Sequence, residues 1–189
     1  MKSGLISISM QGGVASLRKI FIIGIVASGK TTLAKRLSEA LHIPWYELDA
    51  IVHHQTATGR RKRTADEQVE VIQHIDKNGE WIFEGTDRAS YRCLFDMADT
   101  IIFLDTPLWK RKIRIFTRFI KQNLGLEKCG YQPDREMLRL MYQWTREFEE
   151  NRADFESRLH LYEEKMIRLY DSKDMSFAAQ LRYPAKQSD

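Results

Sequence analysis

The amino-acid sequence predicts an α/β fold in three layers, with a five-stranded parallel sheet between helices and a helical lid region. Short apolar segments alternate with amphipathic helical segments along the chain, as is typical of a parallel sheet covered by helices on both faces. The segments KIFIIG (19–24) and DTIIFLD (99–105) show no polar alternation, which predicts strands buried on both sides. The length of 189 residues suits one domain.

The first half of the chain is predicted to hold three strands separated by helices. Apolar residues at helical spacing, a stop at His42-Ile43-Pro44 and a Thr64–Glu67 capping-box pattern locate the helices. The predicted elements are, in order, a strand over 19–24, a helix over 30–41, a strand over 45–49, a loop or irregular helix over 50–63, a helix over 64–78 and a strand over 80–84.

The second half is predicted to add two strands and more helix. Pro107 stands where a helix tolerates proline at its start, and Gly125 is a stop. The predicted elements are a strand over 99–105, a helix over 107–124, a loop over 125–133, one long or two shorter helices over 134–163, a strand over 166–170 and a closing helix over 173–181.

Composition and charge narrow the class of protein. The chain has 43% hydrophobic and 30% charged residues, as globular proteins do, and no apolar run approaches the ~20 residues that span a bilayer. With no membrane segment, no export signal and only two cysteines, we expect a cytoplasmic protein without a disulfide framework. We expect a flexible extension over 1–17, a domain over 18–183 with a lid at about 119–135, and a tail over 184–189.

The segment GIVASGKTT (24–32) follows the first strand directly and fits the pattern Gly-x4-Gly-Lys-Thr of a phosphate-binding P-loop. Small residues let backbone N–H groups face an anion, and the next helix points its positive end at the same place. Lys30 adds a cation for the β- and γ-phosphates, and Thr31 offers a hydroxyl to Mg²⁺. ATP and Mg²⁺ are therefore the predicted cofactors, and the predicted nucleotide contacts are Gly24, Ala27, Ser28, Gly29, Lys30, Thr31 and Thr32.

Four stretches together resemble the small P-loop kinases of the adenylate kinase and shikimate kinase type. More closely, residues 18–182 resemble the bacterial topology modulation (FlaR-like) proteins. The resemblance implies a P-loop NTPase fold and transfer of the γ-phosphoryl group of ATP to a small-molecule or nucleotide acceptor. The stretches are KIFIIGIVASGKTTLAKRLSEALHIPWYELDAI, WIFEGTDRAS, DTIIFLDTPLWKRKIR and IRLYDSKD.

Carboxylates stand where the predicted strands end, at the sheet edge where ligands bind in such folds. The resemblance implies that Asp49 faces the acceptor and orients or deprotonates a hydroxyl, although a helix N-cap is the alternative. It also implies that Glu84 holds Mg²⁺ through water, where relatives usually carry Asp. Gly85 would let a ligand approach the backbone, and Arg88 lies where adenylate kinases place an arginine on the acceptor's phosphate.

The predicted helix over 107–124 has two distinct faces on a helical wheel, and we expect its apolar face to be buried. The apolar face carries Trp109, Ile113, Phe116 and Ile120, and the opposite face carries Arg111, Arg114 and Arg118. The resemblance implies that arginines of this helix clamp the transferring phosphate: Arg114 and Arg118 as catalytic groups and Arg111 on the substrate. A solvated basic face is the alternative. The lid would exclude water from the reaction.

Two patterns leave alternatives open. His53 and His54 are adjacent with no third ligand nearby, so we do not expect a metal there. Lys173 follows the last strand, where related kinases hold adenine, and it is either a nucleotide contact or part of a capped helix start.

Two other functions compete with that of a kinase. The basic runs at 60–63 and 110–121 and the topology modulation resemblance suggest an ATP-binding regulator associated with nucleic acid, with little or no kinase turnover. No recognised DNA- or RNA-binding motif supports that alternative. A degenerate nucleotide-binding protein is suggested only by Glu84. The sequence predicts neither the acceptor nor the oligomeric state.

Overall fold

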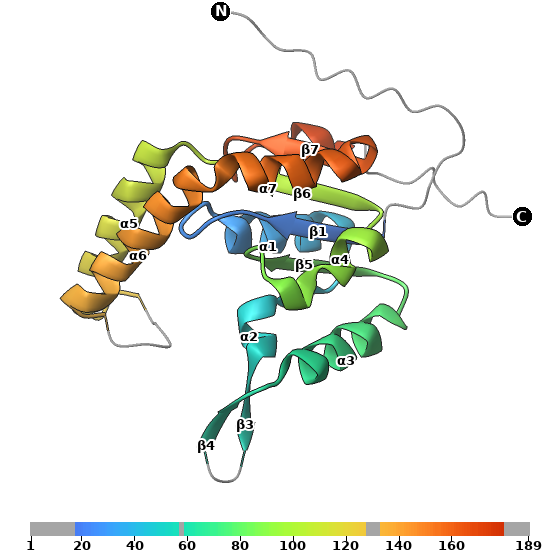
Figure 1. The fold of residues 1–189 in the computed structure, drawn as a ribbon, viewed down its shortest axis with the longest axis horizontal. Coiled ribbons are helices and arrows are strands. Elements are labelled where there is room, and N and C mark those ends of the chain that lie inside the picture. The colour runs from blue at the N-terminus through green and yellow to red at the C-terminus, as the bar shows by residue number, and fades with distance from the viewer. Residues whose placement is uncertain (1–17, 57–58, 128–132, 180–189) are drawn as a thin grey trace, which may run out of the picture.

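The computed structural model describes residues 18–179 except 57–58 and 128–132, and its centre is a five-stranded parallel sheet (Figure 1). The strand order is β2-β5-β1-β6-β7, with neighbouring strands parallel throughout. This confirms the predicted α/β class and the predicted number of strands. The strands are β1 (Lys19–Ile23), β2 (Trp45–Glu47), β5 (Trp81–Gly85), β6 (Thr100–Leu104) and β7 (Met166–Leu169).

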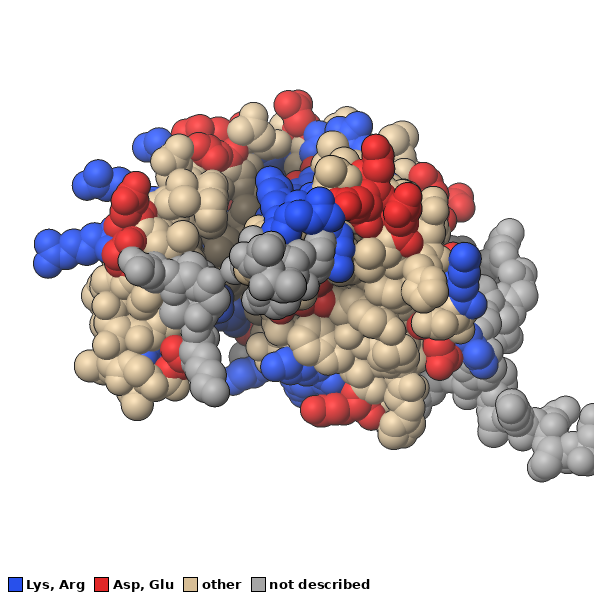
Figure 2. Space-filling view, turned by 90° about the horizontal axis from the view of Figure 1, so that it is seen from below, with Lys and Arg blue, Asp and Glu red and all other residues tan. Residues whose placement is uncertain are grey.

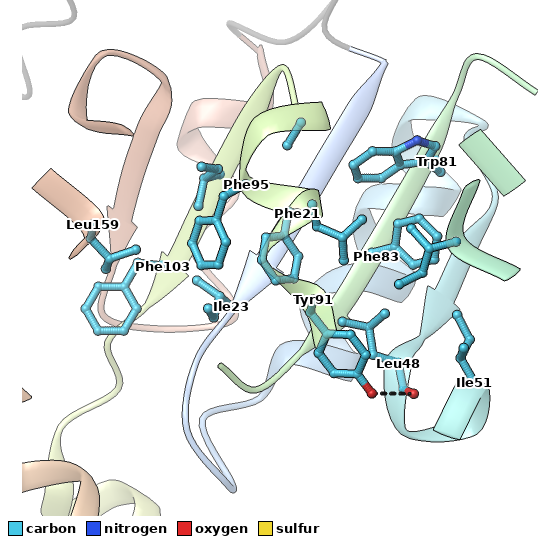
Figure 3. Close-up of a cluster of buried hydrophobic side chains, with 14 of the residues drawn as sticks. Phe21, Ile23, Leu48, Ile51, Trp81, Phe83, Tyr91, Phe95, Phe103 and Leu159 are labelled. Atoms are coloured by element: carbon cyan, nitrogen blue, oxygen red, sulfur yellow. Dashed lines mark hydrogen bonds between the residues drawn. The ribbon is translucent and has the colours of Figure 1, made fainter. Parts of the chain in front are cut away.

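Helices cover both faces of the sheet. Successive residues of a strand point to opposite faces, so each strand contributes side chains to both cores. Ile20 and Ile22 pack under α1 (Lys30–Leu41), together with η3 (Ser176–Ala179) near the end of the described chain. Phe21 and Ile23 enter the other core, where Phe21 meets Phe95 edge to face at 5.1 Å between ring centroids (Figure 3). That face is covered by α2 (Leu48–Val52), α3 (Ala65–Asp76), η1 (Ala89–Tyr91), α4 (Cys93–Met97), α7 (Arg152–Leu159) and η2 (His160–Lys165).

An arm of two helices stands at one edge of the molecule (Figure 1). It consists of α5 (Leu108–Asn123) and α6 (Arg135–Glu150), which pack against each other. Asn123 Nδ2 donates to the carbonyl of Pro133 at 2.8 Å, and Tyr142 Oη donates to the carbonyl of Lys112 at 3.2 Å, so the two helices run antiparallel. In the described ranges, no helix is long and apolar enough to cross a membrane.

The structure confirms several predicted boundaries and corrects others. The helix over 30–41 and the Thr64–Glu67 capping box are as predicted. The second strand ends at Glu47, so Asp49 belongs to a helix, α2. The segment 50–63, predicted as a loop or irregular helix, contains the end of α2 and then an antiparallel hairpin, β3 (His53–Thr56) with β4 (Gly59–Lys62), which projects from the body (Figure 1).

The structure also corrects the predicted closing helix over 173–181, because no helix begins at Lys173. Asp171 accepts from the N–H of Lys173 at 3.0 Å, and Asp174 accepts from the N–H of Ser176 at 3.0 Å. These side-chain turns compete with helix formation. Helical structure in the described residues therefore starts only at η3, and residues 180–181 lie outside them.

Candidate active site

The phosphate loop connects β1 to α1 in a conformation that glycine and small residues permit. Ala27 has a φ of 58° and Gly29 a φ of 101°, both in the left-handed region. Gly24 N–H donates to the carbonyl of Gly85 at 3.3 Å, and a Cβ at Gly24 would lie 2.8 Å from the carbonyl oxygen of Leu104. The loop is thus held between the ends of β5 and β6, the two strands that flank β1 in the sheet.

The N-terminus of α1 has the properties of an anion site. Gly29 caps the helix without a side-chain hydrogen bond, and the first turn holds no acidic residue. The first N–H groups of a helix lack intrahelical partners, and they attract negative charge. Ser28 Oγ is buried and without a hydrogen-bond partner among the described residues. These polar groups fit a phosphate chain.

Lys30, Thr31 and Glu84 meet at the mouth of this loop. Thr31 Oγ1 donates to Glu84 Oε1 at 2.6 Å, and Lys30 Nζ donates to the carbonyl of Ile25 at 3.1 Å. Burial raises the pKa of Glu84 and lowers the pKa of Lys30, while the attraction between the two opposite charges acts against both shifts. Both groups are therefore partly desolvated and face each other.

The donor set suits a magnesium ion better than a metal held by protein alone. Among the described residues, no cluster of three or more His, Cys, Asp or Glu could hold a metal ion. Mg²⁺ typically keeps several waters and takes one or two protein oxygens beside substrate phosphates. The hydroxyl of Thr31 and the carboxylate of Glu84 supply such oxygens next to the phosphate loop.

Arg114 reaches the phosphate loop from α5. Its Nη1 donates to the carbonyl of Ser28 at 2.6 Å and to that of Ala27 at 3.3 Å. Asp171 lies 3.9 Å from Arg114 Nη2 and accepts from Lys110 Nζ at 3.0 Å. Sequence reasoning missed Asp171, although its place directly behind the last strand was a usable indication.

The other two predicted arginines of α5 have internal partners. Arg111 is 1% exposed, donates from Nε to the carbonyl of Thr106 at 2.9 Å and pairs with Glu149 of α6. Arg118 Nε lies 3.0 Å from Glu127 Oε1. Arg111 therefore lies inside the arm rather than at the mouth of the phosphate loop.

The predicted burial of the apolar face of α5 is wrong. Trp109 is 61% exposed and Phe116 51% exposed, whereas Arg111 and Ile115 are buried. A helical wheel gives the two faces of a helix but not which one points inward. Here the arginine face is inward, because Ser28, Thr106 and Glu149 provide acceptors for its guanidiniums.

The acceptor side of the site contains an exposed ion pair. Asp49 Oδ1 lies 2.9 Å from Arg88 Nη2, so the structure brings these two predicted residues together. Gly85 does not present free backbone to a ligand: a Cβ there would lie 2.7 Å from Leu48 Cδ1, and its carbonyl accepts from Gly24. Tyr91 Oη fixes Leu48 by donating to its carbonyl at 3.2 Å (Figure 3).

The predicted basic run 60–63 lies on and just after β4 of the hairpin. Figure 2, seen from the side of the hairpin, shows the surface hollowed between the hairpin and the part that carries α5 and α6. Arg61 pairs with Glu67, Lys62 is exposed, and Arg63 Nη1 donates to the carbonyl of Ile51 at 2.7 Å. Within the basic run 60–63, Arg63 thus supports α2 and Lys62 faces solvent.

Asp105 and Lys173 each follow a strand at the edge of the sheet that carries the phosphate loop. Asp105, after β6, is 2.5 Å from Arg152 Nη2 and fastens α7 to the sheet, so it is not a free metal ligand. Lys173 has an exposed side chain, and its carbonyl accepts from Arg36 Nη1 at 3.0 Å. Of the predicted lid, residues 119–123 belong to α5, and 128–132 lie outside the described residues.

Comparison with known proteins supports the fold. No protein-family model and no curated protein matches the sequence. The structure is similar to a shikimate kinase from Bacteroides thetaiotaomicron, with 17% identity, a TM-score of 0.50, and coverage of 86% of this chain and 92% of that one. It is also similar to a gluconokinase from Sinorhizobium meliloti 1021, with 14% identity, a TM-score of 0.49, and coverage of 88% and 89%. The chain has the three-layer P-loop NTPase fold expected from its sequence.

Proposed function

We propose that this protein is an ATP-dependent kinase that transfers the γ-phosphoryl group to a small-molecule or nucleotide acceptor. The observation that carries the proposal is the position of Arg114, whose guanidinium lies on the carbonyls of Ala27 and Ser28 in the phosphate loop. A loop that only binds a nucleotide does not need this group. An arginine at that point stabilises the charge of a transferring phosphoryl group.

In this proposal each residue of the site has a separate role in binding the nucleotide or in phosphoryl transfer. In this proposal ATP supplies the phosphoryl group and Mg²⁺ neutralises its charge. The small residues of segment 24–32 bind the phosphates through the N-terminus of α1, and Lys30 adds the mobile cation. Thr31 and Glu84 would hold the metal, Glu84 through water, and Lys173 would contact the nucleotide. Arg114 and Arg118 act on the transferring group, while buried Arg111 positions α5 through Glu149.

Asp49 and Arg88 bind the acceptor in this proposal. The carboxylate of Asp49 orients the acceptor hydroxyl and takes its proton, and Arg88 holds an anionic group of the acceptor. Their ion pair is exposed on both sides, and pairs of this kind contribute only about 0–1 kcal/mol. An acceptor with a hydroxyl and an anionic group can therefore replace it at little cost.

The test is ATP turnover against a panel of acceptors: nucleoside monophosphates, nucleosides, shikimate, gluconate and other small hydroxyl compounds. Stimulation by one acceptor, lost in Lys30→Ala, would support the proposal. Arg114→Gln should lower kcat, whereas Lys112→Gln, an exposed cation on the same helix, should not. Binding of ATP with background turnover for every acceptor would contradict a kinase acting on this panel. DNA-dependent hydrolysis would then test the nucleic-acid-associated regulator.

A further inference from the structure

One face of α5 is apolar and points away from the protein. The helix lies at the left edge of the molecule, next to α6 (Figure 1). Its outward stripe consists of Trp109, Ile113, Phe116 and Ile120, which are 61%, 57%, 51% and 41% exposed. Leu124 and Leu126, which follow the helix directly, are also exposed, at 67% and 74%.

The size of this stripe is that of an interface. These six side chains together expose roughly 700 Å², close to the ~800 Å² that each partner contributes to a standard protein–protein interface. Single exposed hydrophobic residues need no explanation, but a contiguous patch above a few hundred Å² indicates a binding surface. The stripe therefore calls for a partner of similar extent.

The spacing of the stripe is its own mirror image. Its four helical members follow one another at four, three and four residues (109, 113, 116, 120), which is the heptad spacing of a coiled-coil seam. Read from either end, the order of steps is the same. When two copies of the helix pair antiparallel around a two-fold axis through the helix centre, each apolar residue of one copy therefore lies opposite an apolar residue of the other.

We propose that two copies of this chain associate through an antiparallel α5–α5 pair. Trp109 then packs against Ile120 of the second copy, and Ile113 against Phe116. Every layer joins one aromatic side chain to one isoleucine, so large and small side chains alternate across the seam, as close packing requires. The proposal does not depend on the kinase function.

The other side of α5 favours a second copy over a membrane surface. An interfacial helix keeps its Lys and Arg face in water or against lipid head groups. Here Arg111 and Arg114 are turned into the protein, because Arg111 is buried and Arg114 lies on the phosphate loop, whereas Lys112 and Lys121 stay exposed. Lys110, at the rim of the stripe, is paired with Asp171 of its own chain. Association through the stripe therefore leaves Lys110 paired with Asp171 and leaves Arg111 and Arg114 in place.

The first experiment is sedimentation velocity of the full chain from 1 to 100 µM. We expect a dimer, and we expect Phe116→Glu to raise its dissociation constant by at least ~100-fold, because a charge would be placed in the central layer. Leu161→Glu is the matched control, since Leu161 is 80% exposed on η2, away from the stripe, and should leave the dimer unchanged. A wild-type chain that stays monomeric at 100 µM, or a dimer unaffected by Phe116→Glu, would overturn the proposal.

The second experiment tests the orientation. In a background with Cys93→Ala and Cys129→Ala, Trp109→Cys is mixed with Ile120→Cys under mild oxidation. An antiparallel pair gives the mixed disulfide, whereas a parallel pair joins each variant only to itself and would refute the arrangement. Monomeric wild type that floats with vesicles of phosphatidylserine and phosphatidylcholine would assign the stripe to a membrane and overturn the dimer.

Discussion

Gly29 combines a left-handed backbone conformation with close side-chain neighbours, so one added methyl group should destabilise the protein in two ways. Its φ of 101° lies in the left-handed region, where alanine costs about 1–2 kcal/mol. An added Cβ would also lie 2.7 Å from Ser172 Oγ and 2.9 Å from Ser172 Cβ. Ser172 is 4% exposed and cannot turn into solvent, and overpacking of this kind costs about 1–3 kcal/mol. We therefore expect Gly29→Ala to lower the free energy of unfolding by about 3 kcal/mol.

Gly79 offers a matched control, because its φ is 78° but nothing lies within 4 Å of an added Cβ. Gly79→Ala should therefore lose only the backbone part, about 1–2 kcal/mol, in urea unfolding at 25 °C followed by tryptophan fluorescence. Adding Ser172→Gly to Gly29→Ala should relieve the steric part and leave the backbone part. Equal destabilisation of Gly29→Ala and Gly79→Ala would refute the close packing of Ser172 on the phosphate loop.

Three further predictions concern a helix end, a helix start and the metal site. His42 caps α1 with a φ of 58° and an exposed side chain, so His42→Gly should raise the free energy of unfolding by up to about 1 kcal/mol, whereas a gain with His42→Ala would contradict this reason. Thr64→Ala removes the side-chain acceptor at the start of α3 and should cost about 1 kcal/mol, and Thr64→Ser should retain most of it. Burial raises the pKa of Glu84 above 4.5, so its carboxylate gains a proton at a higher pH than a free glutamate does. If Glu84 holds Mg²⁺, the Mg²⁺-dependent gain in ATP affinity, measured by calorimetry, should therefore fall on acidification before pH 4.5 is reached. In Glu84→Gln this pH dependence should be absent, and its persistence would rule out the carboxylate as its source.

The sequence predicts the centre of this protein well, because the loop and its flanking elements depend on local patterns. A run of β-branched residues, a glycine loop and leucines at helical spacing determine β1, the phosphate loop and α1 within consecutive residues. The capping box before α3 is equally local. In such segments the side-chain pattern and the final structure agree residue by residue.

The hairpin of β3 and β4 could not be predicted in the same way. Its strands, HHQT and GRRK, have neither apolar alternation nor a hydrophobic core to cover, so burial leaves no pattern in them. They pair with each other outside the main sheet. Strand ends were also misjudged where tertiary contacts decide, as at Leu48, which turns into α2 to fill the space beside Gly85.

The orientation of α5 shows how a site can determine a surface. The guanidiniums of Arg111 and Arg114 on one side of the helix require acceptors. The protein supplies them from the phosphate loop, from Thr106 shortly after β6, and from Glu149 of α6. Once that side is turned inward, the opposite side is turned to solvent, because an α-helix presents both sides at once. The exposed stripe of Trp109, Ile113, Phe116 and Ile120 is therefore the consequence of placing Arg114 on the phosphate loop. Burying that stripe against a second copy satisfies both faces, whereas rotating α5 to bury it internally would remove the arginine from the site.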